Sequence, residues 1–199
     1  AVGIQNMRIA DTRFGQTAPN EVSYYPFAGE PCSQSVFTNQ PEIVPAPYGA
    51  VFDGLSHDSA GGWIASCTDL IRFANAVAPD KTPPGFNNPL DATRRLWMKE
   101  LPQAANDTAA RYFGAGWNFM ANDQGVITSM SKDGALPGTM SWVEYLRQGE
   151  DQVVYVFLFN SRPGPGSKKS SDALVQVRTA LRNFIAQQAG HWPAGNLWP

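Results

Sequence analysis

The chain has 199 residues, of which 43% are hydrophobic and 16% are charged. This composition is typical of one globular domain with an apolar core and excludes a disordered tail. The formal net charge of −2 gives no basic field for a nucleic-acid partner. No run approaches the ~20 apolar residues that span a bilayer, and the polar residues that follow Ile4 do not continue a signal peptide.

Cys32 and Cys67 are the two cysteines. Neither belongs to a Cys-x-x-Cys pair or has histidines nearby, so we expect no metal site and no other cofactor. A disulfide between them would stabilise the chain by about 3 to 4 kcal/mol and imply an oxidising compartment. Two buried, unbonded thiols are the alternative, and the sequence leaves both open.

Residues 1–59 are predicted to form a loop-rich cover. A short strand is expected at 21–25, closed by Pro26, and four prolines between 31 and 47 predict a long ordered loop. His57, Asp58 and Ser59 have a catalytic composition, but adjacent side chains point apart and cannot form a triad by themselves. We therefore interpret them as a polar turn.

Residues 60–105 are predicted to be the helical segment. Ser66 with Asp69 three positions later is close to a capping box. Apolar residues then recur on one helical face, and we interpret Gly61 and Gly62 as a tight entry to this helix. A second helix is predicted at 89–101. The apolar positions of the two helices are Leu70, Phe73, Ala74 and Val77 in the first, and Leu90, Leu96, Trp97 and Leu101 in the second.

Residues 106–199 are predicted to form an antiparallel meander followed by a helix. A strand begins at 112–117, and the aromatic and β-branched runs of 128–160 alternate with turn signals. The run at 153–160 is apolar at nearly every position, which favours a central strand. Lys168 and Lys169 are interpreted as a solvated loop. The helix is expected at 172–187, lying across the sheet, with Leu174, Val175, Val177, Leu181, Phe184 and Ile185 as its apolar positions.

The run from Lys132, Asp133, Gly134 and Ala135 to Leu-Pro-Gly-Thr ends one of these strands beside a turn. It resembles the Lys-Thr-Gly or His-x-Gly strand motif of class C β-lactamase-related and penicillin-binding-protein-like serine hydrolases and esterases. The segment from Gly61 to Leu70 resembles the family's Gly-Gly-x-x-Ser-x-x-Asp-Leu segment, with one more residue before Ser66, and the run from Tyr112 to Trp117 resembles its Tyr-Gly-x-Gly-Trp run. The resemblance implies an α+β fold, the α/β sandwich of that family, with an antiparallel sheet and a C-terminal helix packed on it.

The resemblance also implies an acyl-enzyme mechanism. Lys132 would hold a substrate carboxylate or support proton transfer, while Asp133, Gly134 and Ala135 would bind the substrate. Asp133 departs from the usual Thr or Ser. A carboxylate beside Lys132 would compete with a substrate carboxylate, which favours ester, amide or peptide substrates over β-lactams.

The family nucleophile is a serine at the start of a helix with a lysine one turn later. The one Ser-x-x-Lys match here is Ser129 to Lys132, on a predicted strand, where residues three apart face opposite sides. We therefore expect the N-terminal part of the fold to be absent from this chain and the chain to be inactive alone. Its partner would be the N-terminal half of the same protein, or a second copy joined through an open sheet edge.

A non-catalytic binding or interaction module of the same fold is the alternative. A carbohydrate-binding β-module built on the six tryptophans would not explain the two helices. Family habit, with which Cys32 and Cys67 are compatible, implies export to the periplasm or the outside of the cell.

Overall fold

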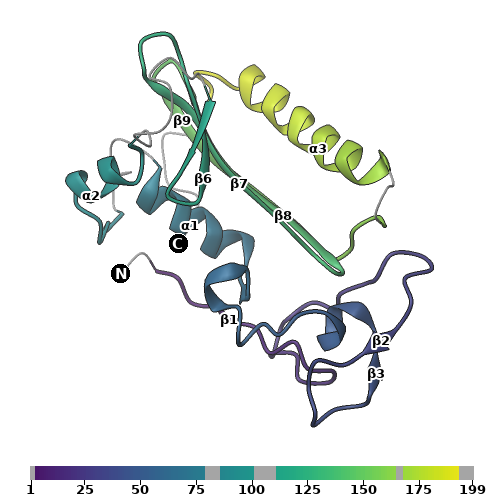
Figure 1. The fold of residues 1–199 in the computed structure, drawn as a ribbon. Coiled ribbons are helices and arrows are strands. Elements are labelled where there is room, and N and C mark those ends of the chain that lie inside the picture. The colour runs from purple at the N-terminus through teal and green to yellow at the C-terminus, as the bar shows by residue number, and fades with distance from the viewer. Residues whose placement is uncertain (1–2, 79–85, 101–110, 165–167, 193–199) are drawn as a thin grey trace.

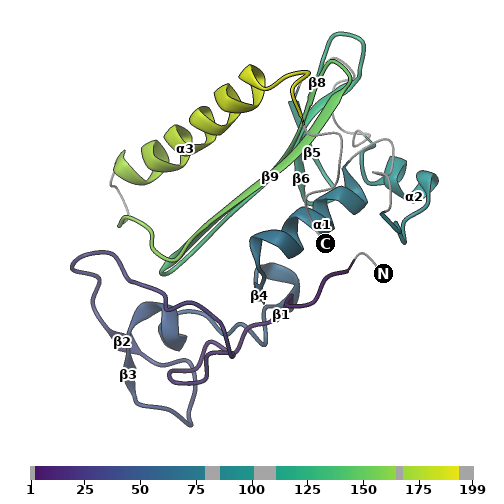
Figure 2. The ribbon, with the colours of Figure 1, turned by 180° about the vertical axis from the view of Figure 1, so that it is seen from behind.

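The computed structural model describes residues 3–78, 86–100, 111–164 and 168–192. At its centre is a five-stranded antiparallel sheet whose strands lie in chain order. Helix α1 (Cys67–Val77) packs on one face and helix α3 (Lys168–Gln187) on the other (Figures 1 and 2). The strands are β5 (Arg111–Gly114), β6 (Trp117–Ala121), β7 (Ile127–Leu136), β8 (Thr139–Gln148) and β9 (Asp151–Phe159).

Tight turns join these strands. Ala115 and Gly116 both have positive φ, 47° and 84°, as the two central residues of a type I′ hairpin between β5 and β6 require. Pro137 and Gly138 join β7 to β8, and Gly138 has the positive φ of 73° that a type II turn needs at its third position. The predicted meander and α+β class are confirmed, with the run from Tyr112 forming a hairpin rather than one strand.

The prediction of a central position for the third run of the meander is wrong for the described sheet. That run is β9, which pairs with β8 and ends the strand order. Beyond β9, Tyr25 makes one isolated parallel bridge with Ser161, at the place where a strand was predicted at 21–25. An apolar run indicates burial of both faces, but it does not indicate whether each edge has a partner strand in the same chain.

The face of the sheet toward α1, called the α1 face below, is apolar. Small residues of the helix, Ala74 and Val77, let it approach the strands, and Met130 is 0% exposed between them. Ser66 caps the helix by accepting a hydrogen bond from the Asp69 backbone N–H at 3.1 Å, as predicted. The buried cluster consists of Ala74, Val77, Ala78, Trp117, Phe119, Met130, Val143 and Tyr145.

The opposite face, called the α3 face, combines an apolar cluster with a buried charge. Ile185 packs with Trp142, Leu146 and Tyr155. Beside them Glu144 is 0% exposed. Its carboxylate accepts hydrogen bonds from Ser129 (2.7 Å), Trp142 (3.1 Å) and Tyr155 on the sheet, and from Arg178 (3.3 Å) and Arg182 on α3.

Helix α3 differs from its prediction in two ways. It begins at Lys168, so Lys168 and Lys169 belong to the helix rather than to a loop. Val175 and Phe184, which were predicted to be apolar contacts, are exposed, whereas Leu174, Leu181 and Ile185 pack on the sheet. Helix α2 (Ala92–Trp97) is shorter than predicted, and Leu96 and Trp97 are each 63% exposed. Residue 101 and the predicted boundary at 105 and 106 lie outside the described residues.

The N-terminal segment consists of short paired strands and turns. β1 (Arg8–Ile9) pairs with β4 (Trp63–Ile64), and β2 (Ser33–Gln34) pairs with β3 (Ile43–Val44). The helical turns η1 (Ala46–Ala50) and η2 (Asp58–Ala60) lie between them. Asp69 joins this segment to α1, since its carboxylate accepts hydrogen bonds from the backbone N–H groups of residues 5 and 6. No helix in the described ranges is long and apolar enough to cross a membrane.

Candidate functional site

The motif that begins at Lys132 lies on a half of β7 with one unpaired edge. The pairing of β6 with β7 ends where Asn118 lies opposite Ser131. From Lys132 to Leu136, β7 pairs only with β8. Within the described ranges no strand covers the other edge of this stretch, so its backbone donors and acceptors are available to an extended ligand.

The four predicted site residues are divided between the two faces of the sheet. Directly opposed residues of antiparallel strands share a face. Lys132 lies opposite Val143 of the α1 face, and Asp133 lies opposite Trp142 of the α3 face. Because side chains alternate along a strand, Gly134 shares the face of Lys132 and Ala135 shares that of Asp133.

Lys132 is exposed, and its Nζ lies 5.8 Å from the centroid of the Phe113 ring. No ion pair joins Lys132 to Asp133, since the two side chains project to opposite faces. The expectation that Asp133 would neutralise the lysine is therefore not supported. The ammonium beside the open edge has an aromatic neighbour and no carboxylate partner among the described residues.

Close contacts define the end of this edge nearest the β7–β8 turn. A Cβ on Gly134 would lie 2.6 Å from the Ser141 Oγ, so the glycine leaves room for that hydroxyl. At the turn, a Cβ on Gly138 would lie 2.6 Å from Pro47 and 3.0 Å from Tyr24. The N-terminal segment therefore closes one end of the open edge, and Phe113 lies near the other.

Gly62 has a structural role, as predicted for the glycines that precede α1. A Cβ there would lie 2.2 Å from the backbone oxygen of Gly54 and 2.7 Å from that of His57. The His57 ring stands 2.8 Å from the Asp53 backbone oxygen through Nδ1. These contacts match a polar turn packed against the entry to the helix.

Ser129 and Lys132 do not form a nucleophile pair. Ser129 is buried on the α3 face, where its Oγ donates to Glu144, and Lys132 projects from the α1 face. The sequence argument that residues three apart on a strand cannot meet is confirmed. Cys32 and Cys67 are free and exposed, so the structure has neither the disulfide nor the buried thiols.

Glu144 is the chemically distinctive residue that sequence reasoning missed. Burial raises the pKa of this carboxyl, but the hydrogen bonds from Arg182, Tyr155 and Ser129 outweigh burial and lower it. The residue is therefore held as a carboxylate. Arg178 and Arg182, four positions apart on the apolar side of a helix, are the signal that could have indicated a buried acid opposite them.

Comparison with known proteins identifies the family. The family model described as Beta-lactamase matches residues 9–179, a range that includes the open edge, α1 and most of α3. No curated protein and no solved structure matches the chain significantly. On the extent of the family match, the chain belongs to the Beta-lactamase family.

Proposed function

We propose that this chain forms one wall of the active site of a serine hydrolase that uses an acyl-enzyme mechanism. The observation that carries the proposal is the unpaired edge of β7 at 132–136, which bears an unneutralised lysine in a chain of the Beta-lactamase family. The motif resembles those of class C β-lactamase-related and penicillin-binding-protein-like enzymes and esterases. The proposed substrate is an ester, amide or peptide, and the argument from Asp133 against β-lactams does not hold, because its side chain lies on the face opposite to Lys132.

In this proposal the substrate lies along the open edge as an added strand. Backbone N–H groups of 132–136 donate hydrogen bonds to it, and one of them stabilises the oxyanion that forms when a serine attacks the acyl carbon. The tetrahedral intermediate expels the alcohol or amine, which takes up a proton. Water then hydrolyses the acyl-serine ester, releasing the acid and restoring the serine.

Lys132 acts through its charge. Its ammonium attracts a carboxylate of the substrate or supports transfer of the proton to the leaving group. Asp133 projects from the other face and does not cancel that charge. Gly134 and Ala135 contribute backbone, not functional groups, to substrate binding.

The nucleophile in this proposal comes from outside the 199 residues. The one Ser-x-x-Lys match is divided between two faces of the sheet. We propose that the N-terminal half of the same protein supplies a Ser-x-x-Lys helix, with a second copy joined through the outer edge of β9 as the other possible partner. This chain is then inactive alone, and the assembled protein functions after export.

A non-catalytic binding module of the same fold is the alternative function. It is favoured by the lack of a helical Ser-x-x-Lys pair in the sequence. In such a module the same edge of β7 would hold a peptide strand without cleaving it.

Covalent labelling separates these functions. The chain is purified with any polypeptide that copurifies, incubated with a fluorophosphonate, and each polypeptide is weighed by intact mass spectrometry. We expect no adduct on this chain and one adduct on a copurifying polypeptide. An adduct on this chain, mapped to a serine such as Ser129, would contradict the external nucleophile. If no polypeptide is labelled, the non-catalytic module is the correct reading.

Lys132→Gln tests whether this chain contributes to the active site. In the assembly that the labelling experiment identifies, assayed without the label, it should slow hydrolysis of an ester substrate by about tenfold or more, because one charge-assisted contact is lost. Arg94→Gln removes a positive charge from the exposed surface of α2 and is the matched control. Equal rates for the two variants would exclude Lys132 from the site.

A further inference from the structure

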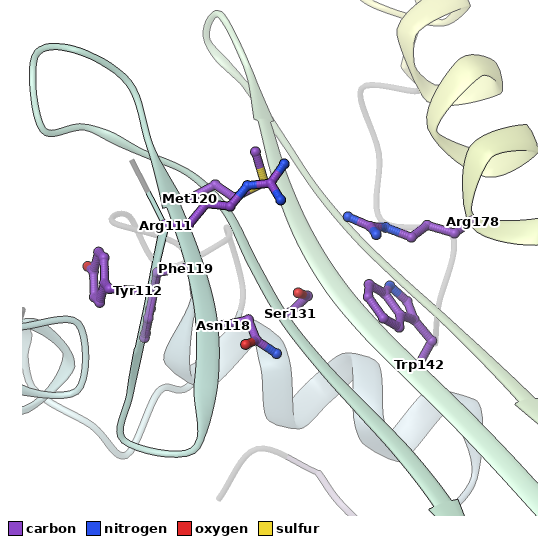
Figure 3. A pocket seen from close by; sticks show the side chains of 8 residues that line it. All are labelled: Arg111, Tyr112, Asn118, Phe119, Met120, Ser131, Trp142 and Arg178. Atoms are coloured by element: carbon purple, nitrogen blue, oxygen red, sulfur yellow. The ribbon is translucent and has the colours of Figure 1, made fainter. Parts of the chain in front are cut away.

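A polar hollow of about 340 Å³ lies on the α3 face of the sheet. It extends over β5, β6 and β7 beside helix α3 (Figure 3). The Lys132 side chain belongs to the α1 face, and none of residues 132–135 lines the hollow, so the proposed hydrolase site does not use it. Its volume is at the lower end of the range for small-molecule pockets.

Two arginines supply its charge. Arg111 of β5 and Arg178 of α3 extend toward one another across β7 (Figure 3). Arg111 has no ion pair with any described residue. Arg178 donates to Glu144 at 3.3 Å, and its guanidinium carbon lies 4.6 Å from the centroid of the Trp142 ring.

The single negative charge of Glu144 is not enough to neutralise the arginines around it. Its two oxygens already accept hydrogen bonds from Arg182, Tyr155, Ser129 and Trp142. One carboxylate therefore faces two arginines of α3, while Arg111 adds a further positive charge. Guanidinium groups that face each other repel unless water or an anion lies between them.

Ser131 is the second, independent feature of the hollow. It is only 6% exposed, and its hydroxyl makes no hydrogen bond with any described residue, whereas Ser129 on the same face is bonded to Glu144. In Figure 3 Ser131 points into the hollow, between Asn118 and Trp142. Asn118 lies directly opposite Ser131 on β6. The hydroxyl is not among the fully buried atoms that lack a partner, so it is accessible from the hollow and can bond a ligand or water there.

We propose that this hollow binds a small molecule through a carboxylate or phosphate group. The forked donors of Arg111 and Arg178 match the oxygens of such an anion, and the Ser131 hydroxyl and the Asn118 amide add neutral donors. Met120 and Trp142 provide an apolar wall for the remainder of the molecule. A cation is disfavoured there, because two arginines and no Asp or Glu line the hollow.

Calorimetry tests this site independently of catalysis. The chain, with any copurifying polypeptide, is titrated with sodium phosphate and separately with sodium benzoate, against sodium chloride at equal ionic strength. Saturable heat with phosphate or with benzoate, and none with chloride, is expected. The better probe identifies which oxyanion the hollow accepts.

Variants locate the binding. Arg111→Gln should weaken the binding of the better probe about tenfold, as expected for loss of a charged donor, and Ser131→Ala should weaken it by a few-fold. Arg94→Gln should leave it unchanged. A Trp142 indole N–H resonance that shifts on titration in the unmodified protein places the probe in the hollow whatever the variants do to folding.

Several results would overturn the proposal. One is equal heat with chloride. Another is equal affinity of the Arg111→Gln and Arg94→Gln variants. A third is an indole resonance that does not move at saturation. Failure of the chain and any copurifying polypeptide to bind either anion would also overturn it.

Discussion

The two faces of the sheet hold their helices by different means. On the α1 face, α1 approaches through small apolar residues, and Met130 and Tyr145 are buried against it. On the α3 face, α3 is held by apolar residues around Ile185 and also by Arg178 and Arg182, which converge on Glu144. Both faces belong to the same strands, since Glu144 and Tyr145 are neighbours on β8.

The two kinds of contact differ more in how precisely they position a helix than in how strongly they hold it. Apolar contacts are non-directional, so a helix held by them can shift with modest loss. A buried carboxylate requires its partners in one place, because a displaced arginine would leave a charge unpaired in a medium of low dielectric constant. We infer that α1 is held mainly by apolar contacts, with Ser66 capping its N-terminal end, and that Glu144 fixes the register of α3 on the sheet.

Truncation of Glu144 should have the largest effect. Glu144→Ala leaves Arg178 and Arg182 without their carboxylate and removes the acceptor of Ser129, Trp142 and Tyr155. Loss of one partner of a buried charge pair costs about 3 to 5 kcal/mol. Urea unfolding measures this loss, and Glu150→Ala, in the exposed β8–β9 turn, is the control. Similar losses in the two variants would show that Glu144 does not hold α3.

Met130→Ala tests the apolar face. The side chain is fully buried against α1, and truncation leaves a cavity, which typically costs about 2 to 5 kcal/mol. Met130 and Glu144 should differ in how much stability a conservative substitution restores. Met130→Leu, which nearly conserves volume, should recover most of the stability, whereas Glu144→Asp should recover little because the shorter side chain withdraws from α3. Recovery by Glu144→Asp in urea unfolding would erase the distinction between the faces.

The sheet was predictable because its signals are local. Alternating runs and the turns at Gly116 and Gly138 are read from neighbouring residues. The position of β9 was not predictable in the same way, because an edge is defined by the absence of a neighbour. Glu144 was missed because one acid among apolar residues of a strand gives no sign that two arginines more than thirty positions away converge on it.

The candidate site was predicted only in part, because some of its features are local in the sequence and others are not. The motif from Lys132 was located by its residues, and alternation along a strand was enough to separate Ser129 from Lys132. The unpaired edge depends on where β6 begins, at Trp117, because its pairing with β7 stops at Asn118 opposite Ser131, and no local pattern shows this. The hollow beside α3 depends on the approach of Arg111 to Arg178, residues from two elements that the sequence does not connect.

The two faces should also respond differently to acid. The folded-state pKa of Glu144 is lowered, so the stability it contributes is present above its unfolded pKa of about 4.3 and is lost as the pH falls through the folded value. Unfolding free energies measured at pH 7, 5 and 3 should fall more steeply for the unmodified chain than for Glu144→Gln. Asp69, whose pKa is also lowered, is unchanged in both proteins and cancels in the difference. Parallel curves would contradict a stabilising carboxylate at Glu144.

The cap of α1 should have the smallest effect and shows where polar groups matter on the apolar face. Ser66 accepts a hydrogen bond from the Asp69 N–H and donates one to the Asp69 carboxylate at 3.0 Å. Ser66→Ala should cost about 1 kcal/mol, while Ser66→Thr keeps the hydroxyl and should cost less. Amide hydrogen exchange should locate the loss in the first turn of α1 and not in α3, since the cap holds only the end of its own helix. Exchange that increases equally in both helices would mean that the cap, like Glu144, acts across the whole sheet.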